Sequence, residues 1–216
     1  MKKQFVIIGC GRFGTSVAKR LFELGVEVMV VDKSEETIQN IADNVTYAVQ
    51  ADATDENSIK SLGIRNFDVA IVTIGSDIQS SILVTLMVKE LGVKYVVAKA
   101  QNDMHAKVLY RIGADRVVFP EREMGTRIAN NLVSDNILEH IQLAPDYSIL
   151  EIVALKDWIG KTLLEVDVRA KYGINVMAIK HEDKLNIAVR ADNMIKDGDV
   201  LVVIGHNDDL KKIEKS

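Results

Sequence analysis

One segment of the sequence constrains the fold more than any other. A short apolar run, Phe5–Ile8, leads directly into Gly9–Gly14 (GCGRFG) and then into an amphipathic stretch. A second apolar run, Val26–Val31, ends at Asp32, near the offset of about 20 residues at which dinucleotide-binding folds place an acidic residue. Glycine allows the tight turn, the approach of backbone N–H groups to phosphate and close helix packing. The pattern predicts a strand, a turn and a helix whose N-terminus can hold phosphate.

The same alternation of apolar runs and amphipathic segments continues from Gln4 to Phe119. Continuous β-branched runs are typical of parallel strands whose two faces are both covered by helices. The predicted strands are Phe5–Ile8, Val26–Val31, Thr46–Val49, Val69–Ile74, Tyr95–Ala100 and Val117–Phe119. Helical segments close at Gly25, Gly63, Gly92 and Gly113, and Ser34 and Thr54 stand where N-caps belong. We predict a Rossmann-like, doubly wound α/β fold with a six-stranded parallel sheet.

Beyond Pro120, apolar residues recur at helical spacing for about twenty residues. The stripe consists of Met124, Ile128, Ala129, Leu132, Val133, Ile137 and Ile141. This crossover helix packs either on the chain's own sheet or against a second subunit. We place it, from about residue 121, in a first domain of residues 1–134, followed by a second domain of residues 135–216.

Within the second domain, the helical pattern breaks at Pro145-Asp146, and the residues that follow are predicted to form a small α+β unit. A unit of about 70 residues has a small core, which makes dimerisation through it a natural expectation. The predicted strands are Ser148–Leu155, Ile174–His181, Leu185–Val189 and Asp199–Gly205, with a helical turn around Leu163–Tyr172 and a short final helix.

Composition narrows the possible functions. With 27 Lys and Arg against 31 Asp and Glu, the net charge is −4, so no basic surface points to nucleic acid. No apolar run approaches the about 20 residues of a membrane span, and the first apolar stretch is too short for a signal peptide. The single cysteine, Cys10, excludes an internal disulfide. We expect a cytoplasmic protein that reaches a membrane only through a partner.

The predicted ligand site combines the glycine-rich segment with the carboxyl ends of the other strands. Gly9, Gly11 and Gly14 would shape the phosphate loop, in which Phe13 is included, and Arg12 would add a positive charge. Asp32 can accept hydrogen bonds from both ribose hydroxyls and would repel a 2′-phosphate, which favours ATP, ADP or NAD over NADP.

Residues at the ends of four predicted strands fall at the ligand-binding edge of the sheet. Lys33 lies beside Asp32, and Asp52-Ala53 and Thr73-Ile74 would flank the base and the phosphates. Thr54 caps a helix or contacts the ligand. Lys99 is interpreted as a charge facing the cleft.

Two patterns resemble a catalytic pair or a metal-binding position. Tyr95 and Lys99 have the spacing of a dehydrogenase pair, but on a strand they stand about 13 Å apart, too far for proton transfer. Glu121 follows Pro120 at a predicted helix start, where an acid is favourable. With a polyphosphate nearby, it would also share a divalent cation.

Several motifs together closely resemble the RCK family, the regulators of potassium conductance, over almost the whole chain. They are Phe5–Gly14, Val30–Asp32, Ala51–Thr54, Ile112–Arg116 and Arg169–Asn175. The resemblance is to the cytosolic regulatory subunit of a Ktr-type potassium uptake system. It implies homodimers assembled into an octameric ring beneath a membrane-embedded potassium-translocating subunit, with ATP favouring transport and ADP the inactive state.

The resemblance also implies roles for particular residues. The glycines and Arg12 would hold phosphates, Asp32 the ribose and Lys99 the cleft, and Glu121 would bind Mg²⁺ or Ca²⁺ near the γ-phosphate. In this family the C-terminal subdomain can bind cyclic di-AMP, and Arg169, Ile174 and Asn175 stand at matching positions. Relatives often place a proline in that pocket, where this sequence has Val189–Asp192.

Two alternatives stay open from the sequence. One is a small NAD(H)-dependent oxidoreductase that uses the same phosphate loop. The other is a free-standing ligand sensor without a membrane partner.

Overall fold

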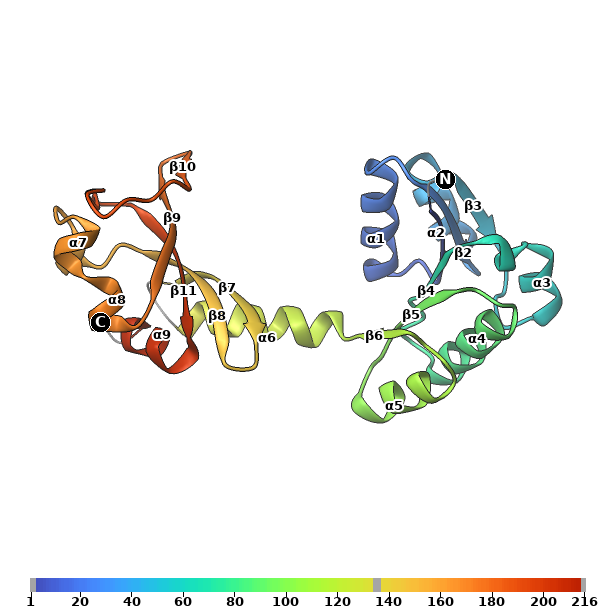
Figure 1. Cartoon of the computed structure of the whole chain (residues 1–216). Helices are drawn as coiled ribbons and strands as arrows, with labels where there is room; N and C mark the ends of the chain where they lie inside the picture. The colour runs from blue at the N-terminus through green and yellow to red at the C-terminus, as the bar shows by residue number, and fades with distance from the viewer. Residues whose placement is uncertain (1–2, 134–136, 215–216) are drawn as a thin grey trace. The chain divides into compact units, whose positions relative to one another are not determined.

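The computed structural model describes residues 3–133 and 137–214 of the chain. It divides into two compact units, Met1–Glu121 and Arg122–Ser216, which are described separately (Figure 1). The predicted boundary between residues 134 and 135 lies outside the described residues, so the assignment of domains stays a prediction.

The first unit is built on a six-stranded parallel sheet with the strand order β3-β2-β1-β4-β5-β6. All six predicted strands are confirmed, with small shifts at their ends. The strands are β1 Gln4–Ile8, β2 Glu27–Asp32, β3 Tyr47–Gln50, β4 Val69–Val72, β5 Tyr95–Lys99 and β6 Arg116–Val118. The helices are α1 Arg12–Glu23, α2 Glu35–Ile41, α3 Glu56–Ser61, α4 Ile78–Glu90 and α5 Asp103–Arg111, with 3₁₀ turns at Ala42–Asn44 and Ile64–Asn66.

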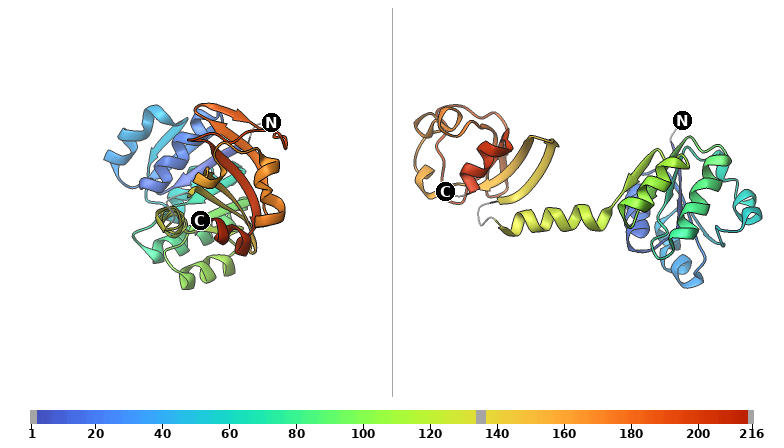
Figure 2. Two further views of the ribbon diagram at one scale, coloured as in Figure 1. Left: turned by 90° about the vertical axis from the view of Figure 1, so that its left-hand side faces the viewer. Right: turned by 90° about the horizontal axis from the view of Figure 1, so that it is seen from below.

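Both faces of this sheet are buried, because neighbouring residues of a strand point to opposite sides. Val6 and Ile8 pack with residues of α3, α4 and α5, whereas Ile7 packs with residues of α1 and α2 (Figures 1 and 2). The doubly wound α/β prediction is confirmed. β1 pairs with both β2 and β4, so the chain reverses its direction of winding beside β1, the point at which such sheets bind ligands.

The ends of the helices follow the predicted residues with one exception. Ser34 caps α2 by accepting a hydrogen bond from the Thr37 backbone N–H. The predicted cap at Thr54 is wrong: Asp55 caps α3 and accepts from the backbone N–H groups of Asn57 and Ser58. The carboxylate one residue closer to the helix reaches two free N–H groups, which displaces the threonine from that role.

The second unit contains most of α6, Pro120–Val133, and a five-stranded antiparallel sheet with the order β10-β9-β11-β8-β7. The predicted continuation of the helix through Ile137 and Ile141 is wrong, because both residues lie in β7, Ile137–Ala144. Residues four apart share one face of a helix and equally one face of a strand. Pairing with β8, Tyr147–Val153, decides between the two.

The remaining elements agree with the predicted α+β unit. They are the 3₁₀ turn Lys156–Trp158, α7 Leu163–Val166, α8 Val168–Tyr172, β9 Asn175–His181, β10 Lys184–Asn186, β11 Val200–His206 and α9 Asn207–Glu214. The predicted strand Leu185–Val189 is shorter than expected. The core of the second unit includes Leu150, Leu201 and Ile213. Helix α9 contacts β8 and β11 (Figure 2).

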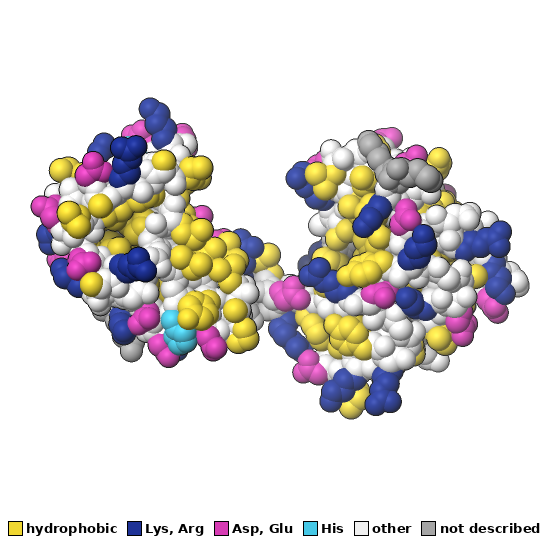
Figure 3. Space-filling view, viewed as in Figure 1, with side chains coloured by type: hydrophobic (Ala, Val, Ile, Leu, Met, Phe, Trp, Pro, Cys, Tyr) yellow, Lys and Arg dark blue, Asp and Glu magenta, His cyan; other side chains and the backbone are white. Residues whose placement is uncertain are grey.

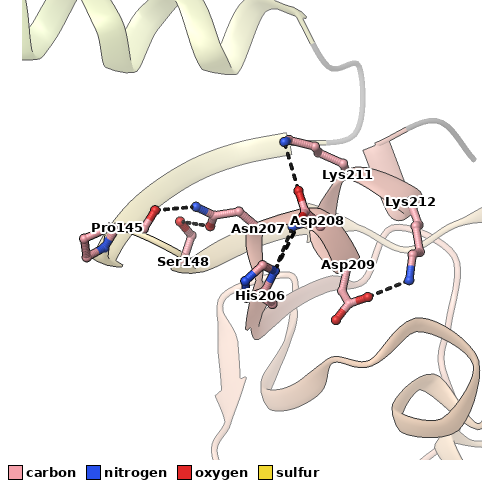
Figure 4. A network of polar contacts seen from close by, with 8 residues as sticks. All are labelled: Pro145, Ser148, His206, Asn207, Asp208, Asp209, Lys211 and Lys212. Atoms are coloured by element: carbon pink, nitrogen blue, oxygen red, sulfur yellow. Dashed lines mark hydrogen bonds and ion pairs between the residues drawn. The ribbon is translucent and has the colours of Figure 1, made fainter.

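A polar network joins the turn between β7 and β8 to the start of α9 (Figure 4). The buried Ser148 hydroxyl donates to Asn207 Oδ1 at 2.8 Å and lies 2.9 Å from His140 Nε2. The Asn207 amide donates to the Pro145 carbonyl oxygen at 3.0 Å. These polar groups hold two chain segments together.

Apolar side chains are exposed on two parts of the second unit. On α6, Met124 and Ile128 are each 50% exposed and Leu132 is 79% exposed. Figure 3 shows a second group over the β7–β8 hairpin, where Ile141 and Leu143 are exposed. Packing of the stripe on α6 against the chain's own sheet or a second subunit stays a prediction. Dimerisation of this unit also stays a prediction.

Candidate nucleotide-binding site

A cavity of about 570 Å³ opens in the first unit at the carboxyl ends of the strands, within the range of about 300–1,000 Å³ typical of small-molecule sites. Of the residues predicted for the nucleotide and its cation, those that line it are Gly9, Gly11, Arg12, Phe13, Asp32, Lys33, Asp52, Ala53, Thr73, Ile74, Lys99 and Glu121. Gly14 is the one residue predicted for the nucleotide and its cation that does not line the cavity. The structure therefore brings together residues from the ends of β1 to β6.

The glycine-rich segment forms a cradle whose three glycines serve different purposes. Gly9 has φ +90°, and a Cβ there would stand 3.0 Å from the Ile74 backbone nitrogen. A Cβ at Gly14 would stand 2.4 Å from the Gly9 carbonyl oxygen, so this glycine allows α1 to pack closely. Gly11 has no neighbouring heavy atom within 4 Å of such a Cβ among the described residues, which leaves open space beside the backbone. That arrangement fits a phosphate at the N-terminus of α1.

Asp32, at the end of β2, is held in place by two backbone N–H groups, one from the glycine-rich segment and one from the residue two positions further along the chain. One carboxylate oxygen accepts from the Cys10 N–H at 2.6 Å and the other from the Ser34 N–H at 2.9 Å. A carboxylate has about four acceptor positions in total. Asp32 is therefore fixed while it keeps the capacity to accept hydroxyl hydrogen bonds from a ribose.

Asp52, beyond β3, is oriented by Thr54. Its Oδ1 accepts from the Thr54 hydroxyl at 2.6 Å and from the Thr54 backbone N–H at 2.9 Å. The hydroxyl hydrogen bond is the main cause that lowers the pKa of Asp52. Thr54 also lines the cavity, so its predicted contact with a ligand stays possible. Ala53, beside it, is a buried part of the cavity wall.

Lys99 and Glu121 form an ion pair at the end of β5. Lys99 Nζ lies 2.5 Å from Glu121 Oε1, and the two side chains are 14% and 72% exposed. The hydrogen bond from Lys99 is the main cause that lowers the pKa of Glu121, and the charge of Arg12 acts in the same direction. Tyr95 and Lys99 lie at opposite ends of β5, as predicted, so they form no proton-transfer pair.

Three cationic side chains and four carboxylates line the cavity: Arg12, Lys33, Lys99, Asp32, Asp52, Asp77 and Glu121. A polyphosphate therefore meets no net positive charge and depends on the backbone N–H groups, on nearby cations and on any metal ion it brings. The described residues contain no cluster of three or more His, Cys, Asp or Glu side chains that could hold a metal. Glu121 fits the mode in which one or two carboxylates share Mg²⁺ with phosphate oxygens.

Sequence reasoning missed Asp77 and Ser80, which line the cavity from the start of α4. Asp77 caps that helix by accepting from the Gln79 N–H at 2.9 Å. Ser76-Asp77 ahead of a helical run was the available signal, because short polar residues are typical of N-caps.

The three residues predicted for a second ligand lie in the other unit. Arg169, on α8, and Asn175, at the start of β9, are exposed. Ile174 is completely buried, and its Cγ2 would stand 2.8 Å from a Cβ at Gly205. None of the three lines the smaller cavity of about 360 Å³ beside β9 and β10. Their role toward cyclic di-AMP stays a prediction.

The only cysteine of the chain belongs to the glycine-rich segment itself. Cys10 is 4% exposed, and its Sγ is 3.2 Å from the Thr15 hydroxyl. Burial raises the pKa of the thiol.

Within the described residues, no helix is both long and apolar enough to cross a membrane.

The chain is an RCK protein with both characteristic parts. Residues 5–120 match the TrkA-N domain and residues 148–216 match the TrkA-C domain. It belongs to the Ktr branch of this family, as its relatives indicate. It is 50% identical over 215 residues to the Ktr system potassium uptake protein C of Bacillus subtilis (strain 168), covering 100% of this chain and 97% of that protein. It is 46% identical over 212 residues to protein A of the same system and organism, covering 98% and 96%.

Solved structures agree with the fold. The GsuK RCK domain superimposes with a TM-score of 0.68 at 17% identity, covering 100% of this chain and 47% of that chain. The GsuK channel bound to NAD gives a TM-score of 0.68 at 16% identity, covering 99% and 39%. The chain thus spans less than half of these longer proteins, and the likeness establishes the architecture alone.

Proposed function

We propose that this protein is the cytoplasmic, nucleotide-binding regulatory subunit of a potassium uptake system. It would bind ATP or ADP and control a membrane-embedded subunit that translocates potassium. One observation carries the proposal: an open glycine cradle beside a fixed Asp32 occurs in a chain that matches a Ktr potassium uptake protein along nearly its whole length. NAD or NADH is the competing ligand, because Asp32 suits any adenosine with a free 2′-hydroxyl.

Each part of an adenine nucleotide has a matching part of the cavity. The N-terminus of α1 and Arg12 would hold the phosphates, and Asp32 would accept from the ribose hydroxyls. Asp52 and Ala53 would flank the base. Lys99 and Glu121 stand where the terminal phosphates would extend, and Glu121 would share Mg²⁺ or Ca²⁺ with a triphosphate.

Regulation follows if ATP and ADP bind the two conformations of an assembled ring with different affinity. A strong shift between two states requires a difference of about 5.5 kcal/mol in total. In an octamer of this chain, eight sites would share that difference at under about 1 kcal/mol each. The proposed role needs no bond to be broken. A role without catalysis agrees with the positions of Tyr95 and Lys99, which lie at opposite ends of β5 and are too far apart to transfer a proton.

Native mass spectrometry of the purified chain tests assembly and ligand together. The expected result is an oligomer that retains adenine nucleotide, and calorimetry with ATP, ADP and NADH should then rank the ligands. Absence of binding by all three would reject the proposal. Steady oxidation of NADH with any carbonyl substrate would favour the reductase instead.

The membrane partner is tested separately. Co-expression with a multi-span potassium-translocating protein should make the growth of uptake-deficient cells at low potassium depend on this chain. If the chain binds nucleotide but neither co-purifies with such a protein nor changes that growth, the free-standing sensor is the better description.

A further inference from the structure

The Lys99 ammonium group is built into the wall of the nucleotide cavity. Its side chain is only 14% exposed, and its Nζ would stand 3.3 Å from a Cβ at Gly75, so the missing side chain of that glycine leaves the space it occupies. A lysine placed in this way is poorly hydrated and requires an anionic partner. In the described chain that partner is Glu121.

Glu121 lines the cavity from the start of α6 and stays mostly exposed to solvent. Its side chain is 72% exposed, and it is the second residue of α6 and the last residue of the first unit. The carboxylate accepts the Lys99 hydrogen bond at 2.5 Å and also feels the charge of Arg12. It thus pairs directly with Lys99, one of the three cations that line the cavity.

We infer that the Glu121 carboxylate is a built-in competitor for nucleotide phosphate, which must displace it from Lys99 before the terminal phosphates can bind there. This inference rests on the proposed nucleotide site and adds a regulatory element to it. Two anions that need the same ammonium group repel each other at close range, and the repulsion is strong where water is partly excluded. The effect grows with the number of phosphates and is absent for adenosine.

Replacement of the Glu121 carboxylate by a phosphate would affect α6, because Glu121 lies in the first turn of that helix. A phosphate that takes Lys99 releases the carboxylate of the residue at which the chain leaves the first unit. Occupancy of the cavity is thereby linked to the first turn of α6.

The test uses Glu121→Gln in the full-length protein, which removes the charge and keeps the size of the side chain. Calorimetric titrations with adenosine, AMP, ADP and ATP are run in EDTA, so that no divalent cation contributes. We expect the variant to bind ADP and ATP about two- to fivefold more tightly than the wild type, the range of one partly exposed ion pair. Adenosine affinity should not change.

Glu56→Gln is the matched control. Glu56 is 65% exposed and its Oε1 also lies 2.5 Å from a lysine, Lys60, but it does not line the cavity. This variant should bind every ligand as the wild type does. In a Lys99→Gln background, the gain from Glu121→Gln should disappear, because no ammonium group is left to compete for.

Equal or weaker binding of ADP by Glu121→Gln in EDTA would overturn the inference. A gain that is as large for adenosine as for ATP would also overturn it, since the effect would not depend on phosphate. Failure of the wild type to bind any adenine nucleotide would instead reject the proposed function. The two failures are therefore distinguishable.

Discussion

The two units of the chain use similar polar side chains in different ways. In the first unit, Asp32, Asp52 and Lys99 stand at the ends of parallel strands and face a common cavity. In the second unit, Ser148 and Asn207 are hydrogen-bonded between a hairpin turn and a helix. Parallel strands end together at one edge and need no turn there, so their terminal side chains stay available to a ligand. Antiparallel hairpins close on themselves, and in this unit polar residues hold the β7–β8 hairpin to the start of α9.

The strongest test of this contrast is Gly14→Ala. The added Cβ would meet the Gly9 carbonyl oxygen and the Thr73 hydroxyl at 2.4 and 2.6 Å. Forced overpacking of this kind costs about 1–3 kcal/mol of unfolding free energy, and we expect nucleotide binding to be lost as well. Urea unfolding and calorimetry would measure the two effects. Normal binding in a stable variant would show that the cradle is not the phosphate site.

Asp32→Ala should give the next largest effect. Loss of hydrogen bonds to a charged acceptor costs about 1.5–3 kcal/mol, or about 10- to 150-fold in affinity, and it should be equal for adenosine, ADP and ATP. Calorimetric titration of the three ligands measures it. Unchanged affinity for adenosine would contradict the assignment of Asp32 to the ribose.

Ser148→Ala examines the second unit in the same way. Removal of the buried hydroxyl deprives the partly buried Asn207 Oδ1 of its donor, and the loss of one such hydrogen bond costs about 0.5–1.5 kcal/mol of unfolding free energy. Nucleotide affinity should not change. A thermal melt paired with a binding assay would separate the two effects, and a loss of affinity would show that the network serves the ligand site.

The smallest expected effect is a pH dependence that originates in the Lys99–Glu121 pair. Lys99 holds the pKa of Glu121 below its ordinary value of 4.5. The pair therefore stabilises the fold above that pH, and its contribution is lost as the pH falls through the lowered value. Unfolding free energies of the wild type and Glu121→Gln should converge on acidification. A constant difference between pH 7 and pH 3 would mean that the carboxylate does not act through its charge.

How much the sequence could predict also differs between the units. Parallel strands buried on both faces read as uninterrupted apolar runs, and the glycine-rich segment with Asp32 located most of the cavity. Ile137 and Ile141 were misassigned because their spacing suits a helix and a strand equally well. The pairing of β7 with β8 is a tertiary fact that local periodicity does not contain.

Within the site, the ion pair between Lys99 and Glu121 was equally hidden from the sequence. The two residues are 22 positions apart and lie on different elements. Each was expected near the cavity for its own reason, as a strand-end cation and as a helix-start acid. Their contact depends on the space that Gly75 leaves, which arises only when the chain is folded.

The buried thiol within the glycine-rich segment supplies a natural reporter. Cys10 is 4% exposed, and alkylating reagents react with a thiolate that solvent can reach. Its modification rate in the folded protein therefore measures how often this corner of the molecule opens. Because the chain has no other cysteine, that opening equilibrium can be followed, with and without bound compounds, on unaltered protein and without an engineered label.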